Sequence, residues 1–240
     1  MPEITEARNI MEEQKDSLSP ISPLARRSFL TGMGTGMTLL GTASALVVPA
    51  SAEAQAVAES HFQPVRHSQD DWLDQIPGKH RCVFDTTSPE GASSAALYAS
   101  NFFIANQSGY NLQNADLAVV IVLRHNSTPF AYNDSIWAKY GIPMSQQAGN
   151  FVDPKTKAAP NINVYRTQLE GLTQRGVHLA VCQMATRVFA GAIARSNGGN
   201  TDAINDELAA NLLANSHAVA AGIVALNRAQ ERGYTFVHAV

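Results

Sequence analysis

The stretch Leu117-Ala-Val-Val-Ile-Val-Leu123 is the strongest fold signal in the chain. It is a continuous apolar run bounded by polar residues, as expected of a β-strand that is covered on both faces. A second run of the same kind is Val177-His-Leu-Ala-Val-Cys182. Strands buried on both faces belong to sheets with helices on either side, so the two runs indicate an α/β domain.

The segments on either side of these runs alternate between strand and helix patterns. His80–Asp85 reads as a first strand, and Ser88-Pro89-Glu90 then starts a helix, with serine as the N-cap and proline at the first helical position. The other expected elements are a helix over 183–195, a short helix over 208–213, a weak strand over 217–220, a helix over 223–232 and a last strand over 234–238. This order predicts right-handed βαβ units in a three-layer α/β/α, flavodoxin-like domain with a mostly parallel five-stranded sheet.

Composition excludes several classes of protein. The chain has 240 residues, of which 45% are hydrophobic, enough for an ordinary core and too many for a disordered chain. Lys and Arg number 17 against 20 Asp and Glu, so there is no basic surplus to bind nucleic acid. No G-x-G-x-x-G or Walker A pattern follows the first strand, and no Cys or His motif has metal-ligand spacing. We therefore expect neither a cofactor nor a metal.

The front of the chain has the order of a secretory signal. Arg26 and Arg27 precede a mild apolar run over 29–48, and the small-residue cleavage patterns Ala50-Ser-Ala52 and Ala54-Gln-Ala56 follow. The arginine pair and the Phe-Leu after it resemble a twin-arginine signal, which implies export to a bacterial periplasm and contact with the membrane only during export. We expect residues 1–56 to be cleaved and 57–79 to form an irregular lead-in. The alternative is an uncleaved anchor, although glycines dilute the apolar run.

Ligands of open parallel sheets bind beyond the carboxyl ends of the strands. The residues expected there are Asp85, Arg124, His125, Cys182 and Gln183. Asp85 orients a partner or caps the next loop, Arg124 binds an anion, and His125 is a general base or a polar loop start.

The position of Cys182 allows two interpretations, one functional and one structural. Its place before a helix, with Arg187 about one turn further on, favours a low thiol pKa and a nucleophilic thiolate. The alternative is a small buried hydrophobic side chain at a strand end. We expect Cys82 to be a core residue, and a disulfide between the two cysteines is unfavourable because they lie at opposite ends of their strands.

The C-terminal half carries a family resemblance. The pattern Leu172-x-x-x-Gly176-Val-x-Leu-x-Val-Cys182 resembles the DsrE/DsrF-like sulfur-relay family, and Ala221-Gly222-Ile-Val-x-Leu-x-x-x-Gln230-x-x-Gly233-Tyr234 is similar to the last helix and strand of that family. The resemblance covers residues 80–240 in the order of elements. It implies a persulfide carried on Cys182, a homo-oligomer, and a small sulfur compound or a partner protein as the other reactant.

Residues 125–163 are longer than a compact connection of this family and form an inserted segment. Phe130, Trp137 and Tyr140 in this segment either line a pocket or bury an inserted helix that starts at Asp134. We expect the histidines of predicted strands, His178 and His238, to be structural, and His61, His67 and His80 to match no metal-ligand spacing.

Three functions remain open at this point. The first is sulfur transfer or thiol redox chemistry at Cys182. The second is a non-catalytic ligand-binding or assembly module of the same fold, and the third is a scaffold for a cofactor loaded before export. Whether the chain is an enzyme stays undecided by its sequence.

Overall fold

The computed structural model describes residues 63–240. The expected signal with Arg26 and Arg27, and also His61, lie outside the described residues. None of the helices within 63–240 is both long and apolar enough to cross a membrane.

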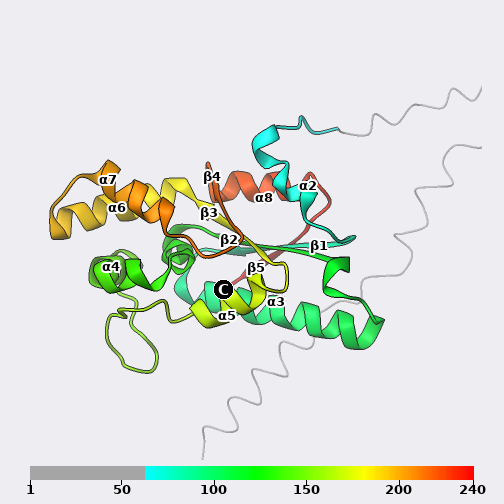
Figure 1. Ribbon diagram of the computed structural model, residues 1–240, viewed down its shortest axis with the longest axis horizontal. Helices are drawn as coiled ribbons and strands as arrows, with labels where there is room; N and C mark the ends of the chain where they lie inside the picture. Colours follow the sequence, from blue (N-terminus) through cyan, green and yellow to red (C-terminus); the bar gives the residue numbers. More distant parts are fainter. Residues whose placement is uncertain (1–62) are drawn as a thin grey trace, which may run out of the picture. The chain divides into compact units, whose positions relative to one another are not determined.

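The described residues form a five-stranded, all-parallel sheet with helices on both faces (Figure 1). The strand order is β4-β3-β2-β1-β5. The strands are β1 (His80–Thr86), β2 (Leu117–Leu123), β3 (His178–Cys182), β4 (Ser216–Val219) and β5 (Thr235–Ala239). This architecture confirms the predicted three-layer α/β/α, flavodoxin-like fold.

Chain direction decides which face each helix covers. From β1 to β4 the chain moves across the sheet in one direction, and right-handed crossovers then place all the connecting helices on one face. These helices are α3 (Pro89–Tyr110), α4 (Asp134–Gln147), α5 (Arg166–Thr173), α6 (Gln183–Asn197) and α7 (Thr201–Ala210). The last crossover returns from β4 to β5 at the opposite edge, so α8 (Gly222–Gln230) lies on the other face, as Figure 1 shows.

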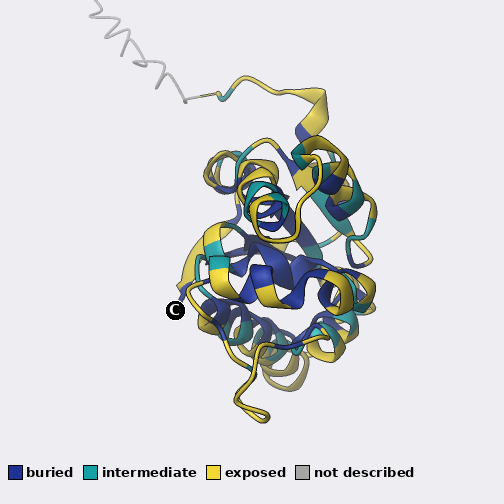
Figure 2. Cartoon of the chain, turned by 90° about the vertical axis from the view of Figure 1, so that its left-hand side faces the viewer, coloured by how far each residue is buried: buried dark blue, intermediate teal, exposed yellow. Residues whose placement is uncertain are grey.

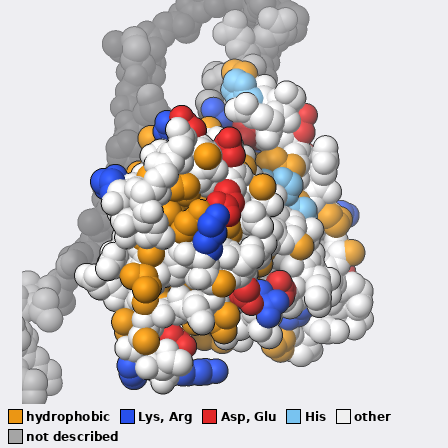
Figure 3. Space-filling model, turned by 60° about the vertical axis from the view of Figure 1, so that its left-hand side comes forward, with side chains coloured by type: hydrophobic (Ala, Val, Ile, Leu, Met, Phe, Trp, Pro, Cys, Tyr) orange, Lys and Arg blue, Asp and Glu red, His pale blue; other side chains and the backbone are white. Residues whose placement is uncertain are grey.

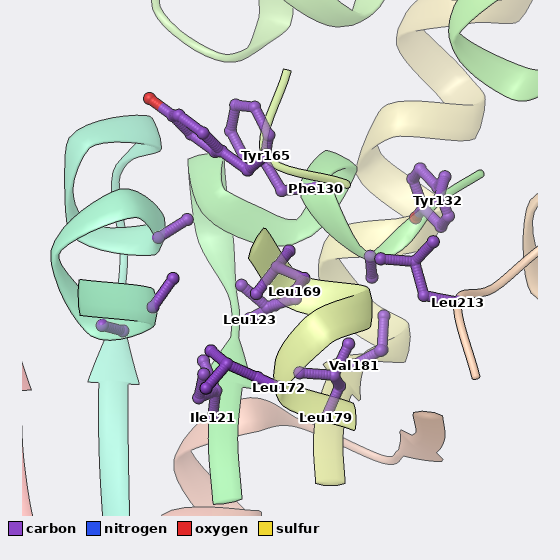
Figure 4. Packing of buried hydrophobic residues seen from close by; sticks show 14 of the residues in the cluster. Ile121, Leu123, Phe130, Tyr132, Tyr165, Leu169, Leu172, Leu179, Val181 and Leu213 are labelled. Atoms are coloured by element: carbon purple, nitrogen blue, oxygen red, sulfur yellow. The ribbon is translucent and has the colours of Figure 1, made fainter. Parts of the chain in front are cut away.

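The sheet separates two hydrophobic clusters. The larger one joins the α3–α7 side with alternate strand residues such as Ile121, Leu123 and Val181. In Figure 4, Leu123 lies beside Leu169 and Ile121 beside Leu172, both leucines of α5. The smaller one joins Val83, Val120 and Ala180 with Leu226 of α8. Figure 2 shows the resulting arrangement, with buried strands between helices whose outer sides are exposed.

Local signals explain most element boundaries. Ser88 accepts a hydrogen bond from the Gly91 N–H at 2.9 Å and starts α3 as predicted, and α3 ends at Asn111 with a left-handed φ of 56°. The short helix expected over 208–213 was misplaced. Asn200 caps α7 through the Asp202 and Ala203 N–H groups, so this helix begins earlier and ends at Ala210.

The inserted segment strengthens the core. It begins with the 3-10 helix η4 (His125–Ala131) and continues into α4, and both contact α6. Phe130 and Trp137 are fully buried and Tyr140 is nearly so, so these side chains belong to the core, while Trp137 also lines a cavity of about 480 Å³. The segment thus packs on the α3–α7 face.

The lead-in is more ordered than expected. It contains the 3-10 helix η2 (Ser68–Asp70) and the short helix α2 (Trp72–Gln75), and Leu73 and Ile76 are buried in the smaller cluster. No periodic pattern marks this segment, because only a few apolar side chains (Trp72, Leu73 and Ile76) anchor it.

Candidate functional site

The carboxyl edge of the sheet has one point at which neighbouring strands lead to opposite faces. The chain leaves β3 toward α6 on one face and leaves β4 toward α8 on the other. Such a switch point opens a crevice, which is where ligands of open α/β sheets bind. Cys182 ends β3 and Ala221 precedes α8, so both lie at this crevice.

Two cavities flank the crevice, and Gln183 lines both. One, of about 360 Å³, lies between α6 and α7, with Thr186, Arg187 and Asp206 in its wall. The other, of about 150 Å³, lies beside the start of α8 and includes Val224. The predicted binding residue Gln183 is therefore placed at the crevice.

Cys182 caps the N-terminus of α6. Its Sγ accepts a hydrogen bond from the Ala185 N–H at 3.4 Å, and the side chain is 7% exposed. The N–H groups and the dipole at a helix N-terminus interact favourably with negative charge, and Cys182 Sγ lies at this position.

The inserted segment supports the end of β3 through α6, on the same face of the sheet. The Tyr132 hydroxyl donates to Thr186 Oγ1 at 2.9 Å, and the Thr186 hydroxyl donates to the Cys182 carbonyl at 3.0 Å. Burial raises the pKa of Tyr132 far above its usual value, and a negative charge at Cys182 acts in the same direction. Tyr132 therefore remains a protonated donor, which fixes the strand end that carries the thiol.

Arg124 lies beside Cys182 in the sheet register. Leu123 pairs with Val181, so Arg124 and Cys182 are the next residues of adjacent parallel strands. The guanidinium donates from Nε to Asp85 Oδ1 at 2.7 Å and from Nη2 to Asp85 Oδ2 at 2.8 Å. The Asp85 hydrogen bonds raise the pKa of Arg124, and the charge of a Cys182 thiolate adds to this effect.

Gly222 lets the start of α8 approach this arginine. A Cβ at this position would lie 2.6 Å from Arg124 Cβ and 2.8 Å from Arg124 Cδ, distances that real side chains do not reach. Glycine is therefore required at position 222 for steric reasons, because α8 contacts Arg124 there.

His238 belongs to the same polar group, which the sequence analysis did not foresee. It pairs in register with Asp85, and its Nδ1 lies 3.2 Å from Asp85 Oδ2, while the side chain stays 43% exposed. Asp85 is 4% exposed and thus shares its carboxylate between Arg124 and His238. The sequence feature that could have indicated this site is a histidine at the carboxyl end of the last strand, which we interpreted as a structural residue.

Within residues 63–240, the other predicted site residues make no hydrogen bond or ion pair with the side chains of this group. His125 has a left-handed φ of 51° and an exposed side chain, and no hydrogen bond or ion pair of the described residues joins it to Cys182. Arg187 Nη1 lies 2.9 Å from Asp202 Oδ1 on α7, and both side chains are exposed. Figure 3 shows this side of the molecule, where several Lys and Arg side chains lie beside Asp or Glu.

The two cysteines differ sharply in their surroundings. Both are free thiols, and β2 separates their strands, which confirms that they do not form a disulfide. Cys82 is 3% exposed in the larger cluster, as predicted, and burial raises the pKa of its thiol. Among residues 63–240, which include His67 and His80, no three His, Cys, Asp or Glu side chains lie close enough together to hold a metal ion.

Comparison with known proteins identifies no family for this chain. No protein-family model and no curated protein matches the chain. A solved structure of a protein of unknown function from Methanobacterium thermoautotrophicum is similar over 67% of this chain and 99% of that one, at 16% sequence identity and a TM-score of 0.38. The site is therefore interpreted from its own geometry.

Proposed function

We propose that this protein carries sulfur on Cys182, as an exported DsrE-like sulfur-transfer or thiol-redox protein. The observation that carries the proposal is the position of Cys182 Sγ at the N-terminus of α6, within hydrogen-bond distance of the Ala185 N–H and next to Arg124 in the register. The proposal takes the Cys182 thiolate as the reacting group, because the thiolate is the nucleophilic form of cysteine.

The proposed step balances with a persulfide donor R–S–S–H as the other reactant. The Cys182 thiolate attacks the terminal sulfur, a new S–S bond forms on Cys182, and the S–S bond of the donor breaks. The donor leaves as the thiolate R–S⁻, and the proton remains with the transferred sulfur. No further oxidant or reductant is needed.

Export by the twin-arginine route, a periplasmic location, a homo-oligomeric state and delivery by a small sulfur compound or a partner protein are parts of the same proposal. They rest on the Arg26-Arg27 pattern and on the family resemblance of residues 172–182 and 221–234.

The experiment compares the two cysteines of the folded full-length chain. Iodoacetamide is added at pH 6.5, about two units below the ordinary thiol pKa, and labelling of each cysteine is read by peptide mass. Cys182 should label faster than Cys82, and a persulfide donor should add the mass of one sulfur atom to Cys182 alone. Arg124→Met should slow the labelling of Cys182, whereas unfolded chain should label equally at both positions.

A non-catalytic binding module is the second candidate. It is favoured by the 7% exposure of Cys182, by the satisfied pairing of Arg124 with Asp85, and by the cavity of about 360 Å³ beside Gln183. If Cys182 labels no faster than Cys82 and takes up no sulfur, sulfur transfer is wrong and the binding module replaces it.

A further inference from the structure

A segment of the lead-in lies across the α8 face of the sheet. We call residues 67–76 the strap. Its Leu73 is buried, and the Leu73 carbonyl accepts hydrogen bonds from the Tyr234 hydroxyl at 2.7 Å and from Arg81 Nη1 at 3.2 Å. Ile76 is buried in the same cluster, so the strap is docked on the domain through side chains and backbone.

One part of the strap forms a wall of the switch-point crevice. Gln69 and Asp70 line the cavity of about 150 Å³ together with Gln183 and residues 218–221. Gln183 follows Cys182 directly in the chain, so this wall of the strap lies at the candidate site. Removing the strap would open this cavity to solvent.

The middle of the strap rests on a pair of histidines. The Trp72 ring stacks on His217 with centroids 3.9 Å apart and planes 9° apart. His178 Nδ1 lies 2.8 Å from His217 Nε2, and the two ring centroids are 5.1 Å apart. The facing nitrogens therefore lie nearly on the line between the rings, as in a hydrogen bond in which one nitrogen donates and the other accepts.

This geometry tolerates only one proton between the rings. If both imidazoles are protonated, two N–H groups point at each other and two positive charges lie side by side in a half-buried site. We propose that the strap is a pH-sensitive cover of the crevice, held by the stack of Trp72 on the neutral His178–His217 pair and released when the pair is protonated.

Most of the other charges near the pair are engaged in ion pairs. β2, β3 and β4 carry no Asp, Glu, Lys or Arg. The charged groups on the strap and α8 and just after α8 are Asp70, Asp71, Asp74, Arg228, Glu231 and Arg232, together with His67 at the start of the strap. Arg228 pairs with Asp70 and Glu231, and Arg232 pairs with Asp74. The Asp71 carboxylate stands outside these pairs and is exposed to water, which screens its attraction for a protonated histidine pair.

The direction of the pH effect follows from burial. Burial and then the charge of His178 lower the pKa of His217 to about 4, and burial also lowers the pKa of His178. A released strap exposes both rings, whose pKa values then return toward about 6.5. Release therefore binds protons: the strap is fully docked above about pH 6.5 and weakens progressively as the pH falls toward 4.

The test follows the indole N–H signals of the full-length chain by NMR between pH 7.5 and 4. The chain has two tryptophans, and Trp137 is an internal control because it is fully buried and its Nε1 donates to the Pro129 carbonyl at 3.0 Å. The Trp72 signal should move to that of a solvent-exposed indole below pH 6.5, while the Trp137 signal stays in place.

Two variants test whether the histidine pair causes the Trp72 transition. His178→Gln leaves His217 under Trp72 and removes its charged neighbour, so the Trp72 transition should move to lower pH. The double variant His178→Gln and His217→Gln should abolish the transition above about pH 5, where carboxylates have not yet been protonated. An unmoved Trp72 signal down to pH 4, or an unchanged transition in the double variant, would overturn the proposal.

The strap does not rest on the proposed chemistry of Cys182. In Cys182→Ser the Trp72 transition should be unchanged, since the thiol lies outside the histidine pair. If the Trp72 transition is normal but Cys182 takes up no sulfur, sulfur transfer is rejected and the pH-sensitive strap is retained. If Cys182 takes up sulfur but the Trp72 signal does not move, the strap is rejected and sulfur transfer is retained.

Discussion

The ion pair between Asp85 and Arg124 offers a direct measure of how firmly the carboxyl edge is held. Asp85→Asn keeps the shape of the side chain and removes its charge. In the native chain the carboxylate accepts two hydrogen bonds from Arg124, and His238 Nδ1 lies within 3.2 Å. An amide would turn one of its NH₂ donors toward donors of the guanidinium, which leaves a charge without its partner.

The exposure of the Asp85 and Arg124 side chains determines how much stability the Asp85→Asn substitution should remove. Removing one partner of a fully buried pair costs about 3–5 kcal/mol, whereas exposed pairs contribute about 1 kcal/mol or less. Asp85 is 4% exposed and Arg124 is 17% exposed, so water can partly hydrate the abandoned guanidinium. We expect Asp85→Asn to lower the free energy of unfolding by about 2 kcal/mol, between these two limits.

The assay is urea unfolding of four full-length chains: wild type, Asp85→Asn, Arg124→Met and the double variant. Because the two side chains contact each other, the double variant should lose less stability than the sum of the single variants, by about 1 kcal/mol or more. Losses that add within about 0.5 kcal/mol would refute the reasoning, since independent sites add in that way.

Two further predictions concern α8 and the front of the chain. Gly222→Ala should lower stability by about 1–3 kcal/mol, because the added methyl group overlaps Arg124; Gly171→Ala in α5, where a Cβ meets nothing within 4 Å, is the matched control and should be neutral or stabilising in urea unfolding. Equal effects of the two substitutions would contradict the steric role of Gly222. Replacing Arg26 and Arg27 with lysine should leave uncleaved precursor in the cytoplasm of a bacterial host, as read by cell fractionation and intact mass, and normal processing of this variant would disprove the twin-arginine signal.

The fold could be predicted because its signals are local. The apolar runs at 117–123 and 177–182 each mark a buried strand, and Ser88-Pro89 marks the start of α3, whatever the rest of the chain does. The misplaced helix over 208–213 shows the limit. Leu212 forms a bridge with Tyr132, and the Leu213 N–H donates to the Ala131 carbonyl, so contacts with the inserted segment override the local helical pattern.

The site could be predicted only in part. Asp85, Arg124 and Cys182 follow from their positions at strand ends, since parallel strands end at one edge. The closeness of His238 to Asp85 depends on β5 pairing with β1, and no residue pattern states which edge of the sheet the last strand joins. The His178–His217 contact has the same origin, because it depends on the pairing of β3 with β4 and on the position of the strap.

The single return crossover from β4 to β5 accounts for these features together. It opens the crevice between β3 and β4, brings His238 beside Asp85, and places the start of α8 against Arg124. It also leaves the α8 face thinly covered, because a helix is about 10 Å wide and five strands at about 4.8 Å spacing spread over about 19 Å. One helix cannot cover that width, so apolar residues beside it need a second cover, and Leu73 and Ile76 of the strap supply it. A cover held by a few side chains and two histidines is weaker than a helix of the main fold, which is the physical condition for a segment that can be released without unfolding the domain.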